Sequence, residues 1–129
     1  MIITALVVAA VAALIHVYIF VLESVLWTTP RARATFGLTE QQAKATAPMA
    51  FNQGFYNLFL ALSIAVGIVL IAVGAVPAGA ALVFAGAGSM VLAGLVLVAS
   101  DRSKARPALI QLVPPLVAVV LLTVGLAAG

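Results

Sequence analysis

Three apolar stretches of this chain carry polar side chains that could do chemistry. Glu23 lies near the end of the first stretch, seven residues after His16, and Gln111 lies in a later one. The second stretch holds four polar residues within six positions: Asn52, Gln53, Tyr56 and Asn57. A carboxylate and an imidazole are common general acids and bases, whereas amides and hydroxyls bind polar ligands. We therefore take Glu23 and His16 as candidate catalytic residues and the amides with Tyr56 as candidate ligand-binding residues.

Membrane-spanning helices must position these residues, because the composition allows no water-soluble surface. Of the 129 residues, 66% are hydrophobic and 7% are charged. A span needs ~20 apolar residues to cross ~30 Å of hydrocarbon, and four stretches are long enough: 2–27, 49–73, 78–99 and 108–128. The first lacks a basic start and is too long for a signal peptide, so we interpret it as a retained span. We predict an all-α, polytopic four-helix bundle that forms a single domain over residues 1–129.

The basic residues predict the orientation of this bundle. All six lie in the links 28–48 and 100–107, namely Arg31, Arg33, Lys44, Arg102, Lys104 and Arg106. The turn at 74–77 carries no charge. By the positive-inside rule both links are cytoplasmic, and both termini lie on the non-cytoplasmic side. Such an asymmetry argues against an antiparallel dimer of oppositely inserted copies.

Several reaction classes are excluded or disfavoured. The chain has no cysteine, which removes disulfide exchange and thiolate nucleophiles. One histidine and one nearby carboxylate make a poor transition-metal site, so we expect no metal and no cofactor. We expect the lipid bilayer as a partner and no nucleic acid.

The polar residues are predicted to converge at one depth. On an α-helix His16, Phe20, Glu23 and Trp27 form one stripe that should face protein. Counting 1.5 Å per residue from the cytoplasmic edge puts Glu23 and Gln111 about 6 Å inside and Asn52 about 5 Å inside. His16 comes out near the midplane. Gly54 provides a flat spot for close approach of a helix or a ligand.

The links and the third span carry local signals. Trp27 and Pro30 predict that the first helix ends near Thr28. Thr29 can cap a short helix that Gly37 ends, and the residues 39–42 have the spacing of a capping box. In the third span, small residues predict close packing within the bundle or, alternatively, an oligomer contact. These small residues are Gly79, Ala85, Gly86, Gly88, Ser89, Ala93 and Gly94.

Five segments of the chain resemble a family of small bacterial four-helix membrane proteins classed as a domain of unknown function. The resemblance is carried by the runs 16–23, 26–33, 36–39, 52–61 and 110–111. It covers essentially the whole chain and implies the fold and a location in the bacterial cytoplasmic (inner) membrane, with no established activity.

Three functions fit these observations. The first is binding of a small amphiphilic or lipid-like ligand in a pocket around Glu23. In an enzymatic version of this function, Glu23 acts as general acid or base with His16 or Tyr56 as its partner. The reaction would be an isomerisation or proton shift on an isoprenoid or sterol-like substrate. The second is proton-coupled transport of a cationic substrate by a parallel homo-oligomer. The third is an accessory or structural subunit, in which the polar cluster joins the helices.

Overall fold

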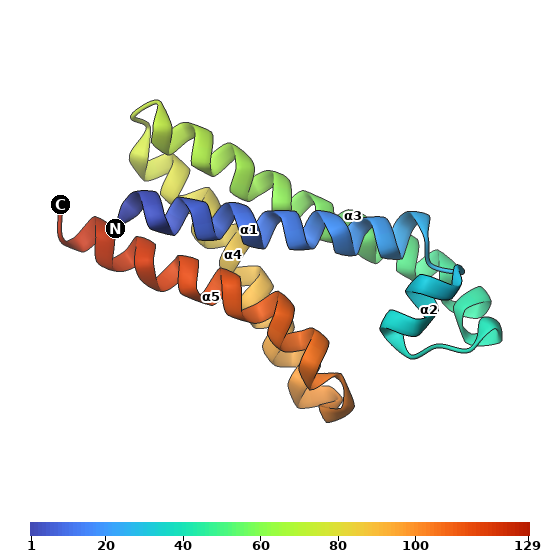
Figure 1. The fold of residues 1–129 in the computed structure, drawn as a ribbon. Coiled ribbons are helices and arrows are strands. Elements are labelled where there is room, and N and C mark those ends of the chain that lie inside the picture. Colours follow the sequence, from blue (N-terminus) through green and yellow to red (C-terminus); the bar gives the residue numbers. More distant parts are fainter. The chain divides into compact units, whose positions relative to one another are not determined.

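The computed structural model describes all residues, 1–129, and contains helices and no strand. In order these are α1 (Ile2–Phe20), a π-helical turn (Val21–Val25), α2 (Pro30–Phe36), α3 (Glu40–Ala72), α4 (Val76–Ser100), a 3-10 turn (Arg102–Lys104) and α5 (Ala105–Ala127) (Figure 1). Four segments are long and apolar enough to cross a membrane: Ile2–Val25, Glu40–Ala72, Val76–Ser100 and Arg102–Ala127. The predicted all-α, multi-pass fold is confirmed, whereas the side on which the termini lie stays a prediction.

The chain divides into two compact units. The first unit comprises Met1–Ile15 and Leu60–Gly129, and the second comprises His16–Phe59. The single domain over residues 1–129 stays a prediction. The second unit contains the end of α1, the π turn, α2 and the first half of α3, which hold most of the candidate site.

Glycines bring the helices of the first unit close together. A Cβ on Gly79 of α4 would lie 2.6 Å from the carbonyl oxygen of Gly67 on α3, so no larger residue fits. One turn before Gly67, Ser63 donates a hydrogen bond of 3.2 Å to the carbonyl oxygen of Leu82. The helices α4 and α5 run side by side from the 3-10 turn (Figure 1). This backbone contact and interhelical hydrogen bond are the interactions expected where no hydrophobic effect drives helices together.

The small residues of α4 lie on two different faces of the helix. Gly79, Gly86 and Gly94 are buried against neighbouring helices, which confirms the prediction of packing within the bundle for the glycines on that face. Ala85, Ser89 and Ala93 are exposed instead. For these three residues the packing prediction was wrong, because α4 turns the stripe that they form away from its partners within the chain.

The link in the second unit follows its capping signals. The Oγ1 of Thr29 accepts a hydrogen bond from the backbone N–H of Ala32, and Gly37 ends α2 with a left-handed φ of 67°. At the start of α3 the backbone N–H of Gln42 donates to Thr39 Oγ1, and the Gln42 side chain accepts from the backbone N–H of Thr39. Both the capped short helix and the capping box are therefore confirmed.

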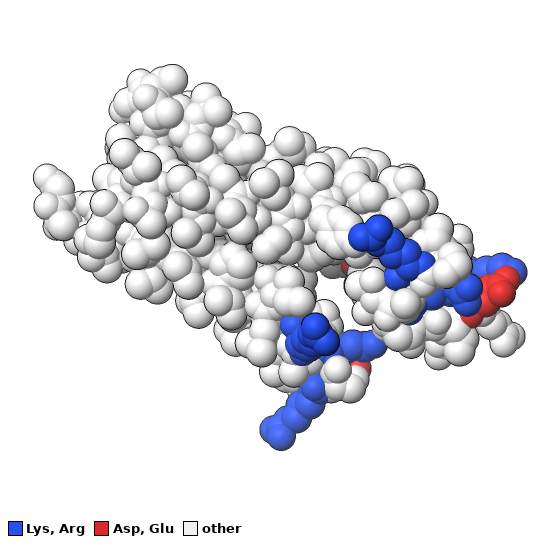
Figure 2. All heavy atoms as spheres, in the orientation of Figure 1, with Lys and Arg blue, Asp and Glu red and all other residues white.

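Lysine and arginine are confined to the links. Figure 2 shows lysine and arginine atoms over the link that contains α2 and over the link between α4 and α5. Asp101 lies in the second of these links and accepts hydrogen bonds from the Ser103 backbone and hydroxyl, which hold the pKa of its carboxyl below the usual value. All six basic residues lie in these two links, and the orientation is predicted from this distribution.

Candidate functional site

A π-helical turn carries the candidate acid. The α-helix α1 ends at Phe20, and the backbone continues as a π turn in which the Leu26 N–H donates to the Val21 carbonyl, 2.9 Å away. The prediction of regular α-helix to Thr28 was therefore wrong for its last turn. A π turn takes about one residue more than an α turn. His16 is buried and Phe20, Glu23 and Trp27 are half-buried, so the prediction that this stripe faces protein is confirmed. π turns are frequent at functional sites.

Gly54 allows this π turn to contact α3. Gly54 is buried, and a Cβ built on it would overlap Ser24 Oγ and lie 3.0 Å from the Ser24 backbone nitrogen. The Ser24 hydroxyl donates a hydrogen bond of 2.8 Å to the carbonyl oxygen of Phe51. The predicted flat spot at Gly54 is thus used for close approach of a helix. Ser24 was missed by the sequence analysis, although a hydroxyl next to Glu23 in an apolar stretch was a usable signal.

The same contact brings Glu23 and Asn57 together. Asn57 Nδ2 donates to Glu23 Oε2 at 2.8 Å, and the same nitrogen is 3.2 Å from the carbonyl oxygen of Gln53. Glu23 and Asn57 are both half-buried. The second carboxyl oxygen, Oε1, accepts no hydrogen bond from the chain. In this part of the predicted cluster, the Asn57 amide therefore orients the Glu23 carboxyl group, and Oε1 of that group remains open to a hydrogen bond.

Asn52 and Tyr56 lie on a different face of α3. At about 100° per residue, Asn52 is about 160° around the helix from Gly54, which contacts the π turn. Both side chains are exposed, and Tyr56 has 65% of its surface accessible. With Phe55 and Phe59 they line a shallow hollow of about 270 Å³. The structure therefore does not bring Asn52 and Tyr56 to Glu23, while Gln53 borders the Glu23 side and is exposed.

The two remaining candidate residues differ in burial. His16 on α1 is only 2% exposed and already interacts with another group of the chain. Gln111 is half-buried on α5, in the first unit, and its amide makes no hydrogen bond within the chain. The joining of Gln111 to Glu23 stays a prediction.

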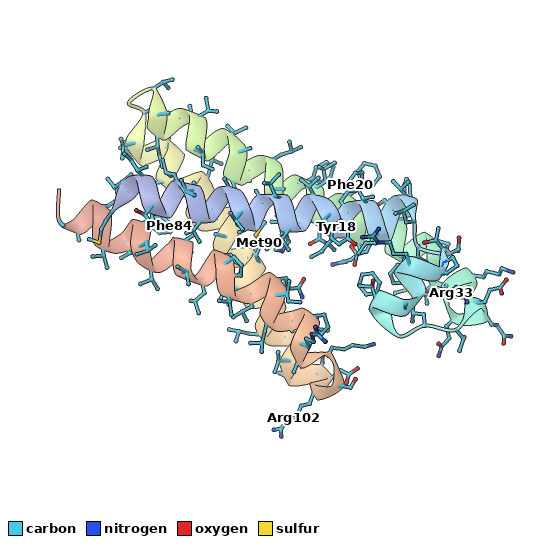
Figure 3. All side chains as sticks on the ribbon, viewed as in Figure 1. Tyr18, Phe20, Arg33, Phe84, Met90 and Arg102 are labelled. Carbon is cyan, nitrogen blue, oxygen red and sulfur yellow. The ribbon has the colours of Figure 1, made fainter.

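Aromatic and cationic side chains surround the π turn in the second unit. Phe20 packs edge to face on Phe55 with ring centroids 5.1 Å apart. Arg31 of α2 donates a hydrogen bond of 3.2 Å from Nε to the Tyr18 hydroxyl, and its guanidinium lies 5.8 Å from the centre of that ring. Tyr18 and Phe20 project from α1 and Arg33 from α2 (Figure 3). These contacts pack the residues just before the π turn against α3 and α2.

One comparison with known proteins gives a match. The family described as "Protein of unknown function (DUF1304)" matches residues 10–123, which include every candidate residue. No curated protein and no solved structure matches the chain.

Proposed function

The chain therefore belongs to this family of unknown function, and we propose from its geometry that it binds a small amphiphilic or lipid-like molecule in the bacterial cytoplasmic membrane. The polar head of the ligand meets Glu23 and Asn57, and its apolar part lies along the spanning helices. The one observation that carries this proposal is the 2.8 Å hydrogen bond between these two residues, which leaves a carboxyl oxygen free.

The free carboxyl oxygen needs a partner. On insertion scales a carboxylate costs about 2.5 to 3.5 kcal/mol at the centre of a bilayer, and an unsatisfied polar group that leaves water carries a cost of its own. Asn57 supplies one donor to Glu23 and spends its second amide hydrogen on the Gln53 carbonyl. A ligand hydroxyl or amine would satisfy Glu23 Oε1, so the proposed ligand carries a hydrogen-bond donor in its head.

Helix lengths favour a site near the membrane boundary. The 33 residues of α3 extend about 50 Å, whereas the hydrocarbon is about 30 Å thick. Counting about 20 residues back from Ala72 reaches Gln53, and counting about 20 forward from Ile2 reaches Val21. Glu23 and Asn57 are each within a few residues of these limits. A molecule with its head at the boundary and its tail in the hydrocarbon suits this depth.

The experiment compares two asparagines on different faces of α3. The wild type and the variants Asn57→Leu, Asn52→Leu and Glu23→Gln are purified gently, and bound small molecules are quantified by native and lipid mass spectrometry. We expect a stoichiometric ligand in the wild type and in Asn52→Leu. The variant Asn57→Leu removes the hydrogen bond to the Glu23 carboxylate, and a hydrogen bond to a charged group is worth about 1.5 to 3 kcal/mol. We therefore expect the ligand occupancy of Asn57→Leu to be at least tenfold lower than that of the wild type.

Two outcomes would contradict the proposal. One is the absence of any stoichiometric small molecule from all four proteins; the other is loss from Asn52→Leu with retention in Asn57→Leu. Proton-coupled transport makes a separate claim, because Glu23→Gln should then abolish flux in liposomes.

A further inference from the structure

One face of α3 is unpartnered within the chain and carries polar groups. Met49, Asn52, Tyr56 and Phe59 follow one another at spacings of three, four and three residues, and all four are exposed. The opposite face carries the buried residues Ala50 and Gly54. We refer to Met49, Asn52, Tyr56 and Phe59 as the outer face of α3.

Two groups on this outer face have no partner. The side-chain amide of Asn52 and the hydroxyl of Tyr56 make no hydrogen bond within the chain, whereas Asn57, on the face that meets the π turn, makes two. Acyl chains offer no donor or acceptor, so a polar side chain in a span must find one in protein, water or a headgroup. The outer face therefore offers open hydrogen-bonding groups beside large apolar side chains, near the membrane boundary.

We propose that the outer face of α3 pairs with the same face of a second copy of this chain in a parallel dimer. An amide both donates and accepts, so two copies of Asn52 are complementary to each other. A two-fold axis places each residue of such an interface near its own counterpart. The predicted orientation, with both basic links cytoplasmic, inserts all copies the same way and puts both Asn52 side chains at one depth.

The spacing fits this arrangement. Alternating steps of three and four residues form the seam of a parallel coiled coil, in which one asparagine fixes the register. No residue of this seam is charged, and the two charged residues of α3, Glu40 and Lys44, precede the seam and pair with each other at 2.7 Å. Like charges therefore do not face each other across the proposed seam.

The exposed stripe on α4 is a weaker interface. Ala85, Ser89 and Ala93 could also allow close approach of a helix, but the Ser89 hydroxyl already donates to the Ala85 carbonyl at 2.7 Å. Nothing on that stripe lacks a hydrogen-bond partner. Of these two exposed stripes, the one on α3 is therefore the one with unsatisfied groups, and the α4 stripe provides the control.

The test uses cross-linking, since the chain contains no cysteine. Single-cysteine variants Met49→Cys, on the outer face of α3, and Ser89→Cys, on α4, are oxidised in membranes with copper phenanthroline. We expect a disulfide-linked dimer from Met49→Cys and little from Ser89→Cys. Equal cross-linking of the two variants, or a preference for Ser89→Cys, would overturn the proposal.

A second measurement removes the hydrogen bonds. Subunit counting by single-molecule photobleaching in dilute vesicles should give dimers for the wild type. Asn52→Leu should weaken dimerisation by about tenfold, in the range found for interhelical hydrogen bonds in membranes, and Tyr56→Phe should weaken it less. Wild-type monomers would refute the dimer and leave a lipid headgroup as the partner of Asn52. Asn57→Leu should leave the dimer intact, which separates this proposal from ligand binding.

Discussion

The close approach of the π turn to α3 can be tested by adding one methyl group, with Gly54→Ala. The new Cβ would overlap Ser24 Oγ and lie 3.0 Å from the Ser24 nitrogen and 3.1 Å from Glu23 Cβ. The hydroxyl can rotate away only by giving up its bond to the Phe51 carbonyl, which costs about 1 kcal/mol. The backbone nitrogen cannot rotate, so the helices must separate, and such overpacking costs about 1 to 3 kcal/mol.

Alanine also favours the helix over glycine by about 1 kcal/mol. The net loss expected for Gly54→Ala is therefore about 1 to 3 kcal/mol of the free energy of unfolding, measured by equilibrium unfolding with SDS in mixed micelles. Gly88→Ala is the matched control, since a Cβ there has no neighbour within 4 Å. We expect this control to be neutral or more stable by up to about 1 kcal/mol. If the two variants are equally stable, the π turn does not rest on Gly54, and the geometry of Glu23 with Asn57 loses its support.

Three further substitutions test the capping and packing contacts. Gly37→Ala places a side chain at a φ of 67° and should cost about 1 kcal/mol, with a smaller loss for Gly37→Asn, both measured by SDS unfolding. Thr39→Ala removes the acceptor for the Gln42 N–H and should cost about 1 kcal/mol, seen as faster hydrogen exchange at that amide. Gly79→Ala puts a Cβ 2.6 Å from the Gly67 carbonyl oxygen and should destabilise at least as much as Gly54→Ala. For each of these, stability or exchange equal to the wild type would contradict the corresponding contact.

Local signals made the fold predictable from the sequence. The four apolar stretches predicted the helices because the length of a span is set by the bilayer. Thr29 and Thr39 predicted the caps, since their side chains act on backbone groups only a few residues away. Such predictions need no knowledge of which helix faces which.

The arrangement of the site was only partly predictable, because it depends on the face of a helix. Depth along the axis placed Asn52 level with Glu23, whereas the structure pairs Glu23 with Asn57, five residues further along α3. The helical period separates them, and the facing side is decided by Gly54, which admits the π turn. The π turn had no clear signal in the sequence. It adds about one residue to the turn that carries Glu23, which a search for a 3.6-residue period cannot detect.

Groups that lack a hydrogen-bond partner lie at two different faces of α3. On the inner face, Asn57 uses both amide hydrogens within the chain, and the group left open is a carboxyl oxygen of Glu23. On the outer face, the amide of Asn52 and the hydroxyl of Tyr56 remain open. A carboxylate accepts hydrogen bonds but cannot pair with its own copy, whereas an amide can. The inner face therefore suits a ligand of different chemistry, and the outer face suits a second copy of the chain.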